Sequence, residues 1–440
     1  MIDRERIRTT DRMTVALDAV EAGIDAASPE NVLRDSISVT DGMLTIGDSA
    51  FDLSGYNDVF VLGGGNAAGR IASHLASVLG PTLSGGVVVT DDPVPAGPVD
   101  VVEGTHPVPS AANRDGARRL LEAARAAGSD TLAVVAVTGG GSALLAAPVE
   151  EVSLADLGGL TDALVRSGAP IDRINAVRKH VSAVKGGRLA CELAPATTVG
   201  VVFSDVTSDD PSVIGSGPLS PDPTSYDDAL AVLSAYGVDA PESVTRHLQR
   251  GAAGEVGETP GPGDSAFDDV SIHILADNAT ATAAAREVCA AAGFEPLVLS
   301  SSIRGESQAA AVTHVAVAEE IQRRGDPVEP PAAILSGGET TVAVGDGDGT
   351  GGPNQEFALR AGVDLPARTV CCAVDTDGLD GSTDAAGAIV DPDTVDDARR
   401  ARAALAAHDV HGYLDERDAV VRTGATGTNV SDLRVLLVPE

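Results

Sequence analysis

Short apolar runs rich in valine and isoleucine recur along the chain, each directly before a glycine-rich turn or an alanine-rich stretch. The pattern is clearest in four segments: residues 58–80, 131–145, 198–212 and 271–293. The runs are continuous rather than alternating, which is typical of strands buried on both faces. Strand, loop and helix in repeated succession predict an α/β fold, with a parallel sheet covered by helices.

Residues 11–27 have the period of an amphipathic helix, with one apolar stripe formed by Met13, Leu17, Val20 and Ile24. At 440 residues the chain exceeds the size of a single core, so two domains are expected. The clearest break is the Gly-, Pro- and acid-rich segment 251–267, which is predicted to be a solvated linker or long surface loop. We therefore expect domains over 1–250 and 268–440.

The charge balance is strongly acidic, with 65 Asp and Glu against 30 Lys and Arg, a formal charge of −35. Such a surface repels nucleic acid and anionic lipid, so neither is an expected partner. Hydrophobic residues make up 43% of the chain, enough to build a core. Acidic surface and few aromatic residues favour a salt-rich cytosol, where screening weakens repulsion between carboxylates. An acidic protein from a GC-rich genome is the alternative.

Neither export nor metal binding is indicated by the cysteines and the N-terminus. The four cysteines show no CxxC pairing or His/Cys cluster, so no disulfide framework or structural metal is predicted. The charged N-terminus lacks the apolar core of a signal peptide. Glycines interrupt the longest apolar region, 131–149, which is therefore no membrane span. We expect a cytoplasmic protein.

The glycine loop Gly63–Gly69 follows a predicted strand and opens a predicted helix. Such a turn directs backbone N–H groups at an anion, typically phosphate, so Gly64, Gly65 and Asn66 are candidate nucleotide-binding residues. The loop is similar to a loosened dinucleotide fingerprint, with Asp91 about twenty residues on. A tight turn that needs glycine for packing alone is the alternative.

A second glycine loop comprises Gly139, Gly140, Gly141 and Ser142. Gly140 and Gly141 allow close approach of a ligand, while Ser142 is expected to cap the following helix and to face that ligand. His106 stands between two turn-like segments. It is a candidate catalytic base, although a lone histidine beside proline is more often structural.

Aspartates cluster just past predicted strand ends, where open α/β sheets bind their ligands. Asp205, Asp209 and Asp210 follow one strand, and hard oxygen ligands there suit Mg²⁺ held together with phosphate. Solvated acidic surface is the alternative. A later segment offers four more: Asp375, Asp377, Asp380 and Asp384.

Lys179 and Lys185 are the only lysines in the chain. The pattern predicts a helix ending at Gly186-Gly187, with an apolar stripe of Ile174, Val177, Val181 and Val184. Arg178 and Lys185 then share a face, with Lys179 about a third of a turn away. Lys185 could merely complement the negative helix end, but arginine would serve equally. Lysine is a compact charge that can titrate, which favours a ligand-binding pair.

Seven segments together resemble the glycerate 2-kinase family, whose C-terminal part is the MOFRL domain, about 330–437 here. They run in the family's order over nearly the whole chain after residue 50: 105–113, 137–148, 174–190, 204–226, 337–359, 375–391 and 423–433. The resemblance implies ATP-dependent phosphorylation of D-glycerate at the 2-hydroxyl, giving 2-phosphoglycerate. It also implies a Rossmann-like N-terminal domain, a smaller α/β C-terminal domain, and an active site in the cleft between them.

The family's motifs also imply roles for individual residues. Arg178, Lys179 and Lys185 would hold glycerate, and Arg188 matches the family as well. Asp205 and Asp210 would bind Mg²⁺ or orient the hydroxyl, and Asp377 or His106 would be the base for its proton. The C-terminal side would line the cleft with Glu339, Asn354 and Glu356. A homodimer is possible.

Two positions depart from the family pattern. Asn66 stands where the family has lysine, and Pro353 stands where it often has arginine. Phosphoryl transfer depends on neutralising charge at the moving group, so the loss of two cations ordinarily costs rate. Three alternatives therefore stay open: a changed substrate, a non-catalytic binding protein, and an NAD(P)H-dependent hydroxypyruvate reductase that holds its cofactor through the Gly63 loop and Asp91.

Overall fold

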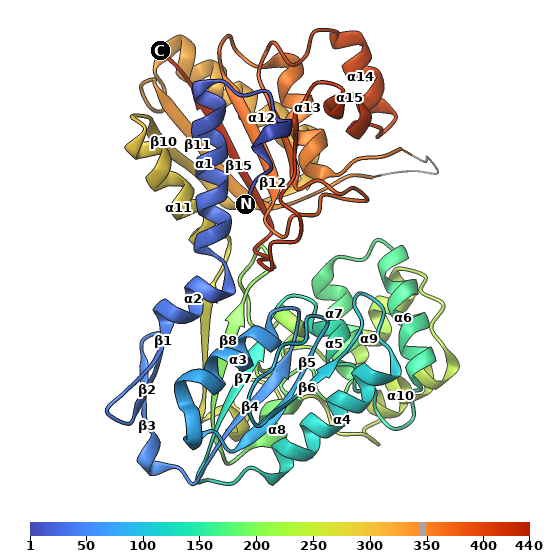
Figure 1. Cartoon of the computed structure of the whole chain (residues 1–440). Coiled ribbons are helices and arrows are strands. Elements are labelled where there is room, and N and C mark those ends of the chain that lie inside the picture. Colours follow the sequence, from blue (N-terminus) through green and yellow to red (C-terminus); the bar gives the residue numbers. More distant parts are fainter. Residues whose placement is uncertain (344–348) are drawn as a thin grey trace. The chain divides into compact units, whose positions relative to one another are not determined.

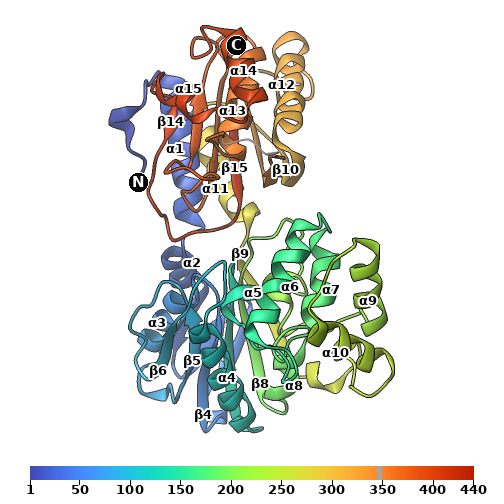
Figure 2. The same ribbon diagram turned by 90° about the vertical axis from the view of Figure 1, so that its right-hand side faces the viewer.

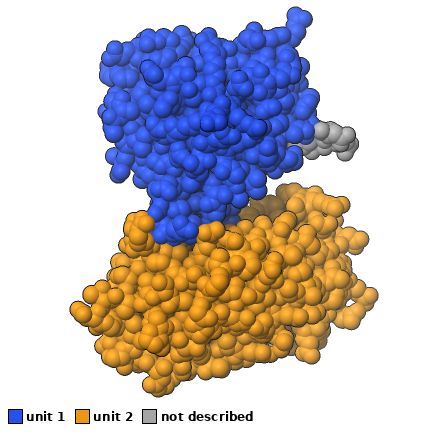
Figure 3. All heavy atoms as spheres, in the orientation of Figure 1, with its two compact units in different colours: residues 1–31, 204–208, 276–440 blue, residues 32–203, 209–275 orange. Residues whose placement is uncertain are grey.

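The computed structural model of the chain describes residues 1–343 and 349–440. Its contacts divide it into two compact units, coloured separately in Figure 3. Unit 1 contains residues 1–31, 204–208 and 276–440, and unit 2 contains 32–203 and 209–275. The N-terminal segment therefore packs with the C-terminal part of the chain, which the linear division at residue 250 did not anticipate.

Unit 2 is built on a six-stranded sheet with the order β6-β5-β4-β7-β8-β9. The registers along this sheet are parallel, as the continuous apolar runs predicted. The α/β fold class is thereby confirmed. The strands are β4 (Asp58–Gly64), β5 (Gly85–Thr90), β6 (Val99–Glu103), β7 (Thr131–Val137), β8 (Thr197–Phe203) and β9 (Val270–Ala276).

Helices of unit 2 fall into two groups. Three of them follow strands of the sheet, α3 (Ala68–Leu79), α4 (Ala111–Ala126) and α5 (Gly141–Leu144), and α8 (Arg188–Leu193) directly precedes β8. The others pack around a core of their own beside the sheet, as both Figure 1 and Figure 2 show: α6 (Leu154–Arg166), α7 (Ile171–His180), α9 (Tyr226–Ala235) and α10 (Glu242–Ala252). Helix α7, which carries Lys179, is thus packed against this core by its apolar side.

A small antiparallel sheet precedes the large sheet of unit 2. Its order is β1-β2-β3, formed by Ile37–Thr40, Met43–Ile46 and Ser49–Asp52, and it follows α2 (Pro29–Ser36). Among the helices described here, none is both long and apolar enough to cross a membrane.

Unit 1 has a mixed six-stranded sheet with the order β10-β11-β15-β12-β13-β14. Only the β10–β11 pair is parallel, and the other four pairings are antiparallel. The strands are β10 (Glu295–Glu306), β11 (Ala332–Thr341), β12 (Val370–Asp375), β13 (Gly387–Val390), β14 (Val420–Val421) and β15 (Asp432–Val438).

Helix α1 (Asp11–Ala26) belongs to unit 1 and packs against α11 (Asn278–Ala291), β12 and β15. Its predicted apolar stripe is confirmed, because Met13, Leu17, Val20 and Ile24 are all buried. A second core includes side chains of the remaining helices and of the sheet. These helices are α12 (Ser307–Arg324), α13 (Pro353–Asp364), α14 (Ala398–Ala406) and α15 (His411–Asp415).

One predicted helix is shorter than its pattern indicated. Helix α7 ends at His180, whereas the apolar stripe predicted helix as far as Val184. The hydroxyl of Ser182 accepts hydrogen bonds from the N–H groups of Val184 and Lys185, offering them an alternative to helical partners. Val181 and Val184 are nevertheless fully buried. The apolar stripe therefore predicted the burial of these residues correctly, but it overestimated the length of the helix.

Candidate active site

Arg178, in the last turn of α7, is a cation that has no partner among the described residues. It is only partly exposed, and burial lowers the pKa of its guanidinium. Within the described residues it makes no hydrogen bond and no ion pair, in a chain with an excess of carboxylates. Burying a charge without a counter-ion costs free energy, and an anion bound from outside the chain would lower that cost.

Lys185 adds a second unpaired charge beside it. Its side chain is 4% exposed, and its Nζ donates to the carbonyl of Leu145 at 2.9 Å. Burial, and then the charge of Arg178, lower its pKa to about 7. No carboxylate of the described residues forms an ion pair with either side chain. We refer to Arg178 and Lys185 as the cation pair.

Ser142 and Asn175 lie near the cation pair and are connected through Ser216. The hydroxyl of Ser142 is 2.9 Å from that of Ser216, which in turn donates to Asn175 Oδ1 at 2.9 Å. The carbonyl of Ser216 accepts from the N–H of Gly186, the residue after Lys185. The second glycine loop, α7 and the lysine segment therefore meet at one place in unit 2.

Both glycine loops pack directly against each other. Asn66 N donates to Gly139 O at 2.9 Å, and Ala67 N donates to the Thr138 hydroxyl at 3.2 Å. A Cβ on Gly140, which has a φ of +75°, would meet the Asn66 amide and the His106 ring. The structure thus brings together Asn66, His106 and Gly140, three of the predicted site residues.

The contact between the two glycine loops determines which of their backbone N–H groups already have a protein acceptor. Those of Asn66, Ala67 and Ala68, at the start of α3, bind protein oxygens. In the second loop, by contrast, no protein acceptor is found in the described chain for the N–H groups of Gly140 and Ser142. Donors for an anion are therefore available from the second loop, next to the cation pair.

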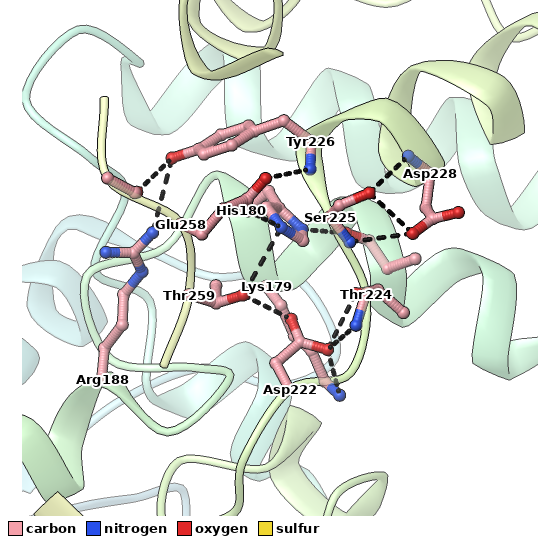
Figure 4. Close-up of polar contacts among 12 residues, drawn as sticks. Lys179, His180, Arg188, Asp222, Thr224, Ser225, Tyr226, Asp228, Glu258 and Thr259 are labelled. Atoms are coloured by element: carbon pink, nitrogen blue, oxygen red, sulfur yellow. Dashed lines mark hydrogen bonds and ion pairs between the residues drawn. The ribbon is translucent and has the colours of Figure 1, made fainter. Parts of the chain in front are cut away.

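Lys179 differs from Lys185 in its environment, although the sequence treated the two as a pair. Its Nζ lies 3.3 Å from Asp222 Oδ1, and both side chains are buried (Figure 4). Asp222 also accepts hydrogen bonds from Thr224 and Thr259. Lys179 is therefore half of a buried ion pair that fixes α7 to the loops beside it.

Sequence reasoning missed the partners that hold the end of α7, shown in Figure 4. Glu258 accepts from His180 Nε2 and, with its other oxygen, from the N–H of Tyr226, which begins α9. The Arg188 guanidinium lies 3.5 Å from the Tyr226 hydroxyl, and its Nε is buried without a partner. Glu258 lies in the predicted surface loop 251–267, which is mostly exposed but anchors α7. Contacts across about eighty residues leave no local signal in the sequence.

The predicted site residues of unit 1 gather near the N-terminus of α13. Asn354 Nδ2 donates to Asp432 Oδ1 at 2.6 Å and to Asp380 Oδ1 at 3.3 Å. Burial raises the pKa of Asp380 to about 6 and also raises that of Asp377. Glu356 is buried and accepts from His408 and Gln308, so its carboxylate is already satisfied within the protein.

Glu339 lies on β11 of unit 1, whereas the candidate metal ligands are divided between the two units. Burial, together with the charges of Asp432 and Asp205, raises the pKa of Glu339. Asp205 belongs to unit 1, where its carbonyl accepts from Ser431, and Asp210 belongs to unit 2, where its carboxylate accepts from Ser212 N. Among the described residues no group of three His, Cys, Asp or Glu side chains is placed to hold a metal ion.

Comparison with known protein families gives matches in both halves of the chain. A model described as a domain of unknown function (DUF4147) matches residues 15–249, and one described as the MOFRL family matches residues 332–432. A relative from Pyrococcus horikoshii, named glycerate 2-kinase, is 36% identical over 435 residues, covering 96% of this chain and 97% of its own. This chain belongs to the glycerate 2-kinase family.

Two further relatives frame the family. The crystal structure of a glycerate kinase from Thermotoga maritima has a TM-score of 0.83 and 34% identity, covering 97% of this chain and 99% of that one. A relative from Agrobacterium vitis, 40% identical over 86% of both chains, bears the name of a hydroxypyruvate reductase. Because members of the family carry the names of two different activities, the reaction of this chain is argued from its candidate site.

The two departures from the family motif have different local settings. Pro353 is the first residue of α13, a position that tolerates proline because its missing N–H would be unpaired there anyway. Asn66 sits between the glycine loops with its Oδ1 buried and unpartnered. Part of the family motif 337–359, residues 344–348, lies outside the described residues.

Proposed function

We propose that this protein is an ATP-dependent kinase that phosphorylates D-glycerate at the 2-hydroxyl. The observation that carries the proposal is the cation pair, two neighbouring basic side chains for which the described residues supply no counter-ion. The substrates would supply the missing anion, since D-glycerate bears a carboxylate and ATP bears phosphates. The P. horikoshii and T. maritima relatives carry the names of this same activity.

Unit 2 offers suitable chemistry for the nucleotide and the substrate. Phosphoryl transfer is accelerated mainly by positioning and by positive charge at the moving group, and Arg178 and Lys185 supply that charge. The N–H groups of Gly140 and Ser142, which have no acceptor among the described residues, would donate to phosphate oxygens. Together with the cation pair, these N–H groups would supply the phosphate contacts that a basic side chain at position 66 supplies elsewhere in the family.

Magnesium would be shared between nucleotide and protein. Mg²⁺ is usually held by one or two carboxylates together with phosphates and water, so no dedicated protein cage is required. Asp210, which belongs to unit 2 together with the cation pair, is the carboxylate that we assign to it. As the base for the substrate hydroxyl, the family resemblance implies Asp377, whose pKa is raised by burial, or His106.

The activity is tested with purified protein, D-glycerate, ATP and Mg²⁺ in concentrated KCl, since the acidic surface favours salt. Coupling to enolase without phosphoglycerate mutase detects 2-phosphoglycerate alone. A signal without mutase supports the proposal. A signal that requires mutase places the phosphate on the other hydroxyl, and folded protein without any signal refutes the kinase assignment.

Reduction of hydroxypyruvate is the second candidate, because the A. vitis relative bears that name. It requires a nicotinamide cofactor at the Gly63 loop, where the N–H groups of Asn66 and Ala67 are already engaged by protein oxygens. A fluorescence titration with NADH separates the two candidates. Saturable binding with turnover of hydroxypyruvate would favour the reductase.

Anion binding should depend on pH through Lys185. Its pKa is lowered from 10.5 to about 7 in the ligand-free protein, and a bound anion favours the charged form. Affinity for phosphate is therefore expected to weaken about tenfold per pH unit above 7, because binding must then take up a proton. Calorimetry in buffers of different ionisation enthalpy measures that uptake. An affinity that is constant between pH 7 and 9 would contradict this.

Stability should change in the opposite direction with pH. Between about pH 7 and 10.5 the unfolded chain holds the Lys185 proton that the ligand-free folded state has released. Stability rises with pH wherever the unfolded state binds more protons, so this lysine contributes a gain across that range. Chemical unfolding of wild type and Lys185→Met, compared at pH 7 and 9, isolates the contribution. Equal pH dependence in the two proteins would contradict it.

A further inference from the structure

Three polar side chains from separate segments form a hydrogen-bonded chain in unit 2. Ser142 follows β7, Asn175 lies on α7, and Ser216 lies in the loop after β8. Both links, Ser142 Oγ to Ser216 Oγ and Ser216 Oγ to Asn175 Oδ1, measure 2.9 Å. An amide oxygen only accepts, so the single proton of Ser216 goes to Asn175. Ser142 must therefore donate its own proton to Ser216.

This chain determines how the Asn175 amide is turned. With Oδ1 held by Ser216, the Nδ2 group points the other way, where it is buried and has no partner. Asn175 is 3% exposed, and a buried donor without an acceptor is costly and rare. Arg178 lies one helical turn further along the same face of α7. The Nδ2 group of Asn175 and the Arg178 guanidinium are therefore two neighbouring donors that could bind the same anion.

Ser216 keeps its side chain in an unfavourable backbone conformation. Its φ of +64° lies in the left-handed region, between Gly215 at +57° and Gly217 at +65°. Residues with a Cβ disfavour this region, whereas glycine adopts it readily. A serine here is explained if its hydroxyl has a task that the flanking glycines cannot perform. Ser216 is 1% exposed, and its hydroxyl is hydrogen-bonded to Asn175 and Ser142.

We propose that Asn175 donates from Nδ2 to the anion bound at the cation pair, and that Ser216 is the positioning residue that orients this amide. The donor completes a three-group recognition site for a carboxylate or phosphate oxygen. The charge of the ligand follows from the geometry alone. Its identity, D-glycerate carboxylate or ATP phosphate, rests on the proposed function.

Steady-state kinetics on two variants tests the proposal. In Asn175→Ala the KM of one substrate is expected to rise about ten- to hundredfold, the effect of losing a hydrogen bond to a charged group. A rise for D-glycerate assigns the donor to the carboxylate, and a rise for ATP assigns it to phosphate. Unchanged KM values for both substrates would overturn the proposal.

Ser216→Gly separates positioning from a merely structural role. Glycine suits the left-handed backbone, so the melting temperature is expected to stay within about 2 °C of wild type while the same KM rises about fivefold. A lower melting temperature with unchanged KM would show that the hydroxyl only supports the fold. Ser212→Ala, in the same loop, is the matched control, since no hydrogen bond of its hydroxyl is found in the described structure.

A binding arm keeps this inference separate from the proposed reaction. If wild type shows no turnover, the kinase proposal fails, and calorimetric titration with inorganic phosphate and with D-glycerate replaces kinetics. Binding to wild type that weakens at least tenfold in Asn175→Ala supports the site without any reaction. Absence of binding to wild type, or equal binding to both proteins, would refute it.

Discussion

Replacing Arg178 with methionine is expected to lower kcat/KM for D-glycerate phosphorylation at least a hundredfold and to leave the protein as stable or more stable. The two effects have one cause, because the guanidinium is partly desolvated and has no partner in the described part of the chain. Loss of one partner from a buried charge pair costs about 3–5 kcal/mol, which corresponds to a factor of roughly 10²–10⁴ in transition-state binding. In the ligand-free protein, methionine removes a charge that is costly to bury.

The measurement is kinase activity and melting temperature on the same preparation. Arg173→Met is the matched control, since Arg173 lies on the same helix but is exposed and paired with Asp172. That control should retain wild-type kinetics. If Arg178→Met unfolds the protein, or keeps full activity, the cation pair is not the anion site.

Replacing Lys179 with methionine is expected to destabilise unit 2 by about 3–5 kcal/mol, because Asp222 is left buried without its counter-ion. Chemical unfolding followed by circular dichroism, at fixed KCl concentration, measures this loss. The double variant Lys179→Met/Asp222→Asn should recover most of the loss, since a buried pair removed together costs much less than a broken one.

An exposed ion pair provides the comparison. Arg166 and Asp162 are 81% and 70% exposed, and Arg166→Met should cost less than about 0.5 kcal/mol. A small effect of Lys179→Met, similar to that of Arg166→Met, would contradict the structural role of Lys179. It would return that lysine to the ligand-binding role that its sequence position first indicated.

Local patterns predicted the elements and the neighbourhood of the site well. Continuous apolar runs identified β4, β7, β8 and β9, and helical spacing identified α1 and the helix around Ile174 and Val177. Rare residue types pointed to the right segment, since the only two lysines of the chain flank the end of α7. Each of these signals is carried by residues within about twenty positions of one another, which is why it can be read from the sequence.

What decides between the two lysines is not local. Asp222 lies 43 residues after Lys179 and pairs with it only once the loops fold back. The partners of Asn175 and of His180 are likewise distant, at Ser216 and Glu258. In a chain with 65 acidic residues, no pattern distinguishes the carboxylate that neutralises a lysine from those that face solvent.

The placement of α1 has a consequence for synthesis of the chain. Its apolar stripe packs on α11, β12 and β15, with Gly23 in contact with Leu433, and all three partners are made after the strands of unit 2. At a ribosomal rate of about 5–20 residues per second, roughly 13 to 50 seconds separate the synthesis of α1 from that of α11, and β15 follows later still. Helix α1 therefore lacks its native contacts during the whole time in which the sheet of unit 2 is made, and we expect its apolar stripe to need shielding by a chaperone in that interval.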